Sequence, residues 1–269
     1  MNKKIGIIGC GWLGLPLAEN LISEGYFVKG TTTSKEKLTL LEEKGITPFQ
    51  ISLSEEGIHG NIEAFLEGVT ILIVNIPPKL RGNGPKESYI SKIKLLHTAI
   101  NKSQVINIIF VSSTAVYGEA EGIVTEKTIP IPTTESGKQL LQCEDLFKND
   151  AKLETTIIRF GGLIGPNRHP ITMLAGKENM KGGHAPVNLI HLDDCIGIIL
   201  AIINHEYWNE VLNAVYPEHP TKKEYYTKLA LDKGLTPPTY QSDDTKTYKL
   251  INSCKFFLIK DYTFFTSIY

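Results

Sequence analysis

The sequence predicts an α/β fold in which helices cover both faces of a doubly wound parallel sheet. First, it contains short runs that are apolar on successive positions, as expected of strands buried on both faces. Second, amphipathic helical stretches alternate with these runs. Third, a glycine-rich turn joins the first run to the first helical stretch. The runs are Lys4–Ile8, Tyr26–Val28, Ile71–Val74, Val105–Val111, Thr155–Ile158 and Val211–Val215.

The first strand is followed by a helix with one apolar face. Leu13, Leu17 and Leu21 recur every four residues, which is the spacing of a helical face. Pro16 falls near the helix start, where a missing N–H costs little. Gly25 is expected to end the helix.

Further helical stretches lie between or after the later strands. We expect them at Ser34–Glu43, Tyr89–Asn101, Gln139–Lys148, Asp193–Asn204 and Lys222–Lys233. After Pro217, prolines, tyrosines and lysines become frequent, which indicates a smaller lobe.

The composition argues against a nucleic-acid-binding protein and against a membrane-spanning one. The 269 residues are 42% hydrophobic and 21% charged with a net charge of −1, which is typical of a globular protein and gives no basic surface for nucleic acid. The longest later apolar stretch, Cys195–Ile203, is shorter than the roughly 20 residues of a membrane span. The four cysteines are far apart, so we expect no disulfide or metal site and a cytoplasmic protein. A small-molecule substrate is the expected partner, and the oligomeric state stays open, a homodimer included.

The glycine-rich turn reads Gly9-Cys10-Gly11-Trp12-Leu13-Gly14 and has the GxGxxG spacing. In a strand–turn–helix context, Gly9 would permit the tight turn and Gly11 would let a diphosphate approach the backbone. Gly14 would let helix and strand pack closely, and the helix N-terminus would supply free N–H groups. The turn therefore predicts a Rossmann domain that binds a nicotinamide dinucleotide, with Trp12 and Leu13 also at the cofactor. We expect residues 1–160 and 187–216 to form this domain, and 161–186 with 217–269 to form a small substrate lobe.

The end of the second strand bears on the choice of cofactor. An NAD enzyme usually has Asp or Glu about 20 residues into the motif. This chain has Thr32, Thr33 and Ser34 in that region, and no carboxylate that would repel a 2′-phosphate. These hydroxyls and a lysine can hold the phosphate instead, which favours NADP over NAD. The alternative is that the hydroxyls cap the next helix.

Two prolines follow the strand that ends near Val74. Loops at the carboxyl ends of parallel strands line the ligand crevice. We therefore expect Asn75 and Pro77 to border the cofactor groove, with a purely structural lip as the alternative.

Three later segments follow one another in a recognisable order: Ser112-Ser113-Thr114-Ala115-Val116-Tyr117-Gly118, Arg159–Pro166 and Asn188–Asp194. In sequence and order they resemble segments of the extended short-chain dehydrogenases/reductases, the group of nucleotide-sugar epimerases, dehydratases and reductases. The resemblance implies hydride transfer between a substrate carbon and the nicotinamide. It also implies that Ser112 lies at the cofactor and that Ser113 holds the substrate hydroxyl or carbonyl.

The sequence departs from this family at the catalytic Tyr-x-x-x-Lys. One register places Ser136 at the tyrosine and Leu140 at the lysine, and a second places Thr134 at the tyrosine and keeps Lys138. Neither register contains a phenol, so the chain resembles an atypical branch without the usual pair. Tyr117 is the remaining candidate acid/base, although in the family this tyrosine mostly packs.

Three further groups are weaker candidates. Arg168 and His169 follow Gly165-Pro166, where the family's substrate lobe begins, and could meet an anionic substrate or simply be solvated. His191 is expected to be structural. Asp193 and Asp194 are expected to cap the next helix and to favour its dipole.

These observations favour an NAD(P)-binding oxidoreductase or epimerase/dehydratase-like enzyme that acts on a nucleotide sugar or a small carbonyl compound. The alternative is a non-catalytic NADP-binding regulatory protein, which the missing Tyr/Lys pair supports. A third interpretation rests on Ile7–Pro16, which also resembles β-hydroxyacid dehydrogenases. Strands that continue beyond Val105 argue against it, because those enzymes have an all-helical second half.

Overall fold

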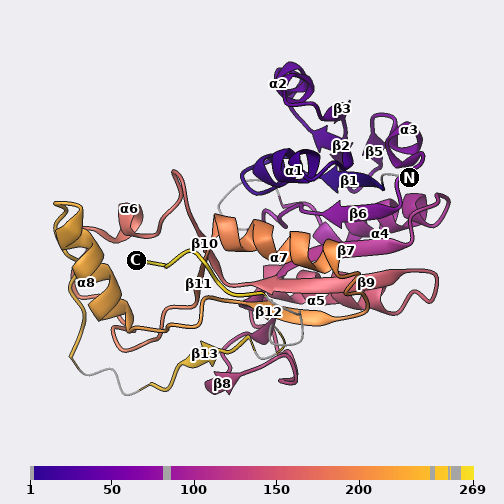
Figure 1. The fold of residues 1–269 in the computed structure, drawn as a ribbon. Helices are drawn as coiled ribbons and strands as arrows, with labels where there is room; N and C mark the ends of the chain where they lie inside the picture. The colour runs from indigo at the N-terminus through magenta and orange to yellow at the C-terminus, as the bar shows by residue number, and fades with distance from the viewer. Residues whose placement is uncertain (1–2, 81–85, 243–245, 254, 256–261) are drawn as a thin grey trace.

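The computed structural model describes residues 3–80, 86–242, 246–253, 255 and 262–269. Their central feature is a seven-stranded parallel sheet with the strand order β12-β9-β7-β6-β1-β2-β3 (Figure 1). Its strands are β1 (Lys4–Ile8), β2 (Phe27–Thr32), β3 (Thr47–Gln50), β6 (Ile71–Val74), β7 (Asn107–Ser113), β9 (Glu154–Phe160) and β12 (Val211–Ala214). The predicted α/β Rossmann fold with a doubly wound parallel sheet is confirmed.

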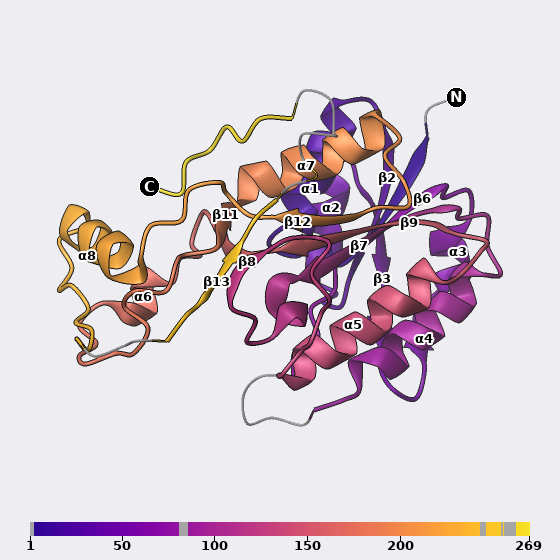
Figure 2. The same ribbon diagram turned by 90° about the horizontal axis from the view of Figure 1, so that it is seen from below.

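Helices cover both faces of the sheet (Figure 2). On one face lie α1 (Gly14–Ser23) and α7 (Leu192–Asn204), and α2 (Lys37–Glu43) adds Leu41 to the same core cluster. On the other face lie α3 (Ile62–Leu66), α4 (Tyr89–Ile100) and α5 (Glu135–Lys148). The two apolar faces of the buried strands thus each have a helical layer.

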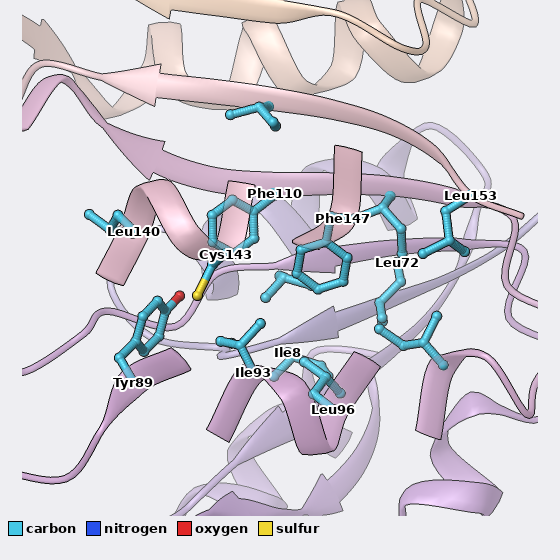
Figure 3. Packing of buried hydrophobic residues seen from close by; sticks show 14 of the residues in the cluster. Ile8, Leu72, Tyr89, Ile93, Leu96, Phe110, Leu140, Cys143, Phe147 and Leu153 are labelled. Atoms are coloured by element: carbon cyan, nitrogen blue, oxygen red, sulfur yellow. The ribbon is translucent and has the colours of Figure 1, made fainter. Parts of the chain in front are cut away.

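The α4–α5 side of the sheet has a densely packed core (Figure 3). The rings of Phe110 from β7 and Phe147 from α5 lie 5.3 Å apart, and both side chains are fully buried. Leu140 of α5 belongs to the same cluster and is 4% exposed. This burial matters for the site, because Leu140 occupies one of the positions where a catalytic lysine would stand.

Helices α6 (Ile171–Leu174) and α8 (Lys222–Asp232) lie together at one end of the molecule (Figure 1). Two short parallel strand pairs lie outside the main sheet, β10 (Gly162–Ile164) with β11 (Leu189–His191) and β8 (Gly122–Val124) with β13 (Lys249–Ile251). A third apolar cluster joins Ile171 and Tyr225 with Ile268 near the end of the chain. The domain boundaries given above stay a prediction.

Several predicted boundaries were wrong. Helix α5 begins at Glu135 rather than Gln139, because Thr134 caps it: the Gly137 N–H donates to Thr134 Oγ1 at 3.1 Å. Helix α7 begins at Leu192 with His191 as its N-cap, so neither aspartate caps it, but Asp193 and Asp194 both lie in the first turn, where they favour the helix dipole as predicted.

The second strand and the helix after it also differ from the prediction. Strand β2 continues to Thr32, and α2 begins only at Lys37 with no side-chain cap. The hydroxyls of Thr32–Ser34 therefore do not cap this helix. Seven short strands were not predicted, namely β3, β4 (Ser52–Leu53), β5 (Ile58–His59), β8, β10, β11 and β13. Within the described residues, no helix combines the length and apolar character that a membrane crossing requires.

Candidate dinucleotide site

The strand order reverses between β1 and β6. From β1 the sheet continues through β2 and β3 on one side, and from β6 through β7, β9 and β12 on the other. In open α/β sheets, ligands bind outside the carboxyl ends of the strands at this switch point. Gly9 follows β1 there, and Asn75 follows β6.

Two glycines of the turn are required by close backbone contacts. Gly9 has a φ of +104°, and a Cβ added to it would lie 2.4 Å from the Asn75 carbonyl oxygen. A Cβ on Gly14 would lie 2.1 Å from the Gly9 carbonyl oxygen. Both distances are shorter than any side chain tolerates, so this turn cannot form with other residues at these positions.

Gly11 differs from the other two, because a Cβ added to it would have no other described atom within 4 Å. The N–H groups of Trp12, Leu13 and Gly14 donate no hydrogen bond to any part of the chain that the structure describes. Leu13 provides no side-chain cap for α1, whose first turn holds no acidic residue. An open face with unpaired N–H groups at a helix N-terminus suits a diphosphate.

Neighbouring strands hold the turn in place. The Gly9 N–H donates to Thr31 Oγ1 at 3.0 Å, and the Cys10 N–H donates to the Thr31 carbonyl at 2.9 Å. From β6, Asn75 Nδ2 donates to the Gly9 carbonyl at 3.1 Å. Asn75 thus positions the turn, as does Thr31, which the sequence analysis missed because only the pairing of β1 with β2 brings the two strands together.

The end of β2 carries a carboxylate that the sequence analysis did not weigh. Thr32 is 8% exposed and its hydroxyl accepts a hydrogen bond from the Ser34 N–H at 3.2 Å, whereas Thr33 is exposed. Ser34 Oγ donates to Glu36 Oε2 at 2.5 Å, and this hydrogen bond lowers the pKa of the exposed Glu36 carboxyl. Lys35 beside it is exposed. A 2′-phosphate bound here would therefore lie near both the negative carboxylate of Glu36 and the positive side chain of Lys35.

The loop after β6 forms a fixed edge beside the turn. Pro77 is exposed, and the Tyr89 hydroxyl donates to the Ile76 carbonyl at 2.9 Å. Tyr89 is buried at the start of α4, and burial raises its pKa well above the ordinary value. This phenol therefore supports the loop and stays protonated.

The two serines at the end of β7 point to different surroundings. Ser112 is 5% exposed and its hydroxyl donates to Glu144 Oε1 at 2.5 Å. Ser113 is half-buried and its oxygen accepts a hydrogen bond from the Ala115 N–H at 3.2 Å. Since Ser113 Oγ acts as an acceptor there, its proton is available to a substrate oxygen.

Tyr117 is 1% exposed and is part of a buried polar network. Its hydroxyl donates to Asn213 Oδ1 at 2.8 Å and accepts from Arg159 Nη1 at 2.9 Å. Arg159 in turn pairs with Glu144 at 2.6 Å. Burial raises the pKa of Tyr117, which opposes a role as base. The catalytic role of Tyr117 stays a prediction, and this geometry argues against it.

Neither register places a phenol in the first turns of α5 at the position of the family's catalytic tyrosine. Ser136 is half-buried and Leu140 lies in the core. In the other register, Thr134 caps the helix and Lys138 is exposed. Among the residues described, no group of three or more His, Cys, Asp and Glu side chains could hold a metal ion.

The loop after β10 contacts the glycine turn. Trp12 Nε1 donates to the Pro166 carbonyl at 3.0 Å, and Arg168 lies over the Trp12 ring with its Cζ 4.8 Å from the ring centroid. His169 faces into the lobe, where its Nε2 lies 3.0 Å from the Tyr225 hydroxyl. Arg168 is therefore beside the predicted cofactor turn, and His169 is not.

The sequence matches a family model described as NAD(P)H-binding over residues 9–192. Protein YeeZ of Escherichia coli (strain K12) is 33% identical over 256 residues, which cover 94% of this chain and 92% of that protein.

Two solved structures share the fold. UDP-glucuronic acid 4-epimerase of Bacillus cereus, solved in complex with NAD, matches with a TM-score of 0.79 at 20% identity, covering 98% of this chain and 92% of that one. MoeE5, solved with UDP-glucuronic acid and NAD, matches with a TM-score of 0.79 at 19% identity, covering 98% of this chain and 95% of that one. At these identities the likeness concerns the fold.

Proposed function

This chain belongs to the NAD(P)H-binding family, and on that premise we propose that it binds NADP and transfers hydride as an oxidoreductase or epimerase/dehydratase-like enzyme. The substrate class is a nucleotide sugar or a small carbonyl compound. The observation that carries the proposal is the turn at Gly11, whose open face and three unpaired N–H groups lie at the switch point of the sheet.

The cofactor site consists of residues at three strand ends. The N–H groups of Trp12, Leu13 and Gly14 would bind the diphosphate. Thr33 and Ser34 after β2 would contact the adenosine ribose or its 2′-phosphate, with Lys35 as the nearby cation. The preference for NADP rests on these hydroxyls and this cation, and the carboxylate of Glu36 opposes it.

The reaction would take place at the ends of β6 and β7. When bound, the nicotinamide supplies or accepts the hydride. Ser113 would donate a hydrogen bond to the substrate carbonyl oxygen through the proton that its contact with Ala115 leaves free. Asn75 and Pro77 would border the groove. With Ser136 and Leu140 at the family's acid/base positions, the chain would belong to an atypical branch of the short-chain dehydrogenases/reductases.

A second function, that of a non-catalytic NADP-binding regulator, is favoured by one observation. Burial of Leu140 in the core excludes a charged group at that position, and no phenol stands at Ser136 or Thr134. A protein of this kind would bind the cofactor without turnover.

Activity on a substrate panel separates the two functions. NADPH and NADH affinities are measured first, and NADPH oxidation is then followed with nucleotide sugars and small carbonyl compounds. We expect the wild type to turn over one of these two substrate classes. Ser113→Ala should lower kcat by about tenfold or more, which is the usual effect of losing a hydrogen bond made in the transition state. NADPH affinity should stay unchanged.

Ser23→Ala is the matched control, since Ser23 is exposed at the far end of α1. Tight NADPH binding without turnover on any substrate would favour the regulator. Full activity in Ser113→Ala would remove this serine from the mechanism.

A further inference from the structure

We propose that Arg168 binds the diphosphate of the bound dinucleotide, with Trp12 of the glycine turn as the platform that holds its guanidinium. The inference rests on the proposed cofactor site and adds a cation to it from a segment about 150 residues further along the chain. It also makes the loop between β10 and α6 part of the cofactor site.

The contact between Trp12 and this loop has two components. The indole N–H donates to the Pro166 carbonyl at 3.0 Å, and the Arg168 guanidinium lies over the indole ring with its Cζ 4.8 Å from the ring centroid. Trp12 also carries one of the unpaired backbone N–H groups of the turn. The guanidinium is therefore tied to a residue whose own backbone faces the diphosphate.

The conformation of the loop between β10 and α6 brings Arg168 close to Trp12. Gly165 and Arg168 exchange backbone hydrogen bonds of 2.9 and 3.0 Å, which closes a tight turn with Asn167 at a φ of +57°. A Cβ on Gly165 would lie 3.1 Å from Trp12 Cζ2 and 3.0 Å from Leu192 Cβ. A side chain at Gly165 would push Trp12 or Leu192 by a few tenths of an ångström, so glycine allows the loop to pack closely against the indole.

Arg168 is exposed, and no carboxylate pairs with it in the described part of the chain. A guanidinium that stacks by its face keeps its N–H donors free at the edge, in a geometry that matches phosphate oxygens. Asp193, in the first turn of α7, places its Oδ2 3.2 Å from His191 Nδ1 and forms no ion pair with Arg168. The cation beside the turn is thus available to an anionic ligand.

The geometry also links the cofactor to the substrate lobe. Pro170 is the N-cap of α6, two residues after Arg168, and Ile171 packs into the apolar cluster of the lobe. A dinucleotide held by both Trp12 and Arg168 would bridge the sheet and the lobe.

Arg168→Gln tests this role by direct binding. Dissociation constants are measured for NADH and NADPH by their fluorescence anisotropy, and for ADP-ribose by displacement of NADH. ADP-ribose has the diphosphate but lacks the nicotinamide and the 2′-phosphate. We expect the variant to bind all three about tenfold more weakly, which corresponds to the loss of one charge-assisted contact of about 1.4 kcal/mol.

Lys177→Gln is the matched control, because it removes an exposed charge from the same lobe away from Trp12. Trp12→Leu should weaken binding as well, and the double variant should lose less than the product of the two effects, because both act on one contact. Unchanged melting temperatures would exclude a folding defect in each variant.

The alternative outcomes are distinct. Equal affinities in wild type and Arg168→Gln, or a loss confined to NADPH, would overturn the role of Arg168 at the diphosphate and leave the proposed function standing. If the wild type bound none of the three ligands, the proposed function itself would fall, and this inference with it.

Discussion

At the scale of single residues, the three glycines of the turn fall into two groups. Gly9 and Gly14 are needed because an added Cβ would lie 2.4 and 2.1 Å from backbone oxygens. Gly11 has open space around it, so the fold does not require glycine there. The spacing predicted that Gly9 and Gly14 must be glycine, because the geometry of a strand–turn–helix is local, whereas the approach of a diphosphate to Gly11 stays a prediction.

The partners of the turn could not be predicted in the same way. Thr31, Asn75 and Arg168 contact the turn from positions up to about 150 residues away. Their contacts depend on which strands pair and how the loop after β10 folds back. Glu36 was missed for a different reason, since it lies beyond the hydroxyl-rich segment and reaches Ser34 by its side chain.

His169 gives the protein a specific acid sensitivity. Its Nδ1 accepts from the Ile171 N–H at 3.1 Å, so the neutral ring donates from Nε2 to Tyr225. Burial lowers its pKa from 6.5 to about 4, so the folded protein takes up this proton less readily than the unfolded chain. The contribution to stability is complete above about pH 6.5 and is lost as the pH falls toward 4.

Urea unfolding at several pH values measures this effect. The free energy of unfolding of the wild type should fall more steeply between pH 6.5 and 4 than that of His169→Gln, which cannot take up the proton. Parallel curves for the two proteins would show that the ring is not held neutral.

At the scale of elements, α5 shows how capping decides where a helix begins. The apolar periodicity predicted a start at Gln139, whereas the Thr134 cap places it at Glu135. Gln139 Oε1 accepts from the Tyr89 and Ile90 N–H groups, so this side chain caps α4 instead. Side-chain caps across elements leave no signal in the periodicity of either helix.

Helix α7 holds the described C-terminal segment 262–269 through one buried carboxylate. Asp194 is 0% exposed and accepts from the Tyr262 hydroxyl at 2.7 Å and from the N–H groups of Phe265 and Thr266 at 3.0 and 3.2 Å. A Cβ on Gly197 would lie 2.9 Å from the Phe265 ring, so glycine at this position lets the segment lie close against α7.

Asp194→Asn should loosen this segment without unfolding the sheet. The amide replaces one carboxylate oxygen by a donor, so a backbone N–H loses its acceptor in a buried site. Hydrogen exchange in residues 262–269 should rise by roughly tenfold or more, consistent with a loss of about 1–3 kcal/mol. Asp193→Asn, at an exposed neighbouring position, is the control. Identical exchange in both variants would contradict the assigned role.

At the scale of the whole molecule, the sequence predicted the layers because strands buried on both faces are visible as apolar runs. β6 is buried at all four positions and is an example. Strand β3, by contrast, is not visible as an apolar run, because none of its four residues is fully buried, and it was not predicted. The packing of 262–269 onto α7 and the lobe could not be predicted from the sequence either, because a tail rich in aromatic residues could equally have formed a subunit contact.

Gly11→Val provides the most direct measurement of the central claim, that the open backbone of the turn binds a dinucleotide. A Cβ at Gly11 meets no other described atom within 4 Å, so the valine side chain would extend into the space that the diphosphate needs, whereas Gly57→Ala places a methyl group in open space away from the turn. The account predicts that isothermal titration of Gly11→Val with NADPH and NADH gives no detectable binding, with a melting temperature close to that of the wild type. Binding with wild-type affinity in Gly11→Val would contradict it.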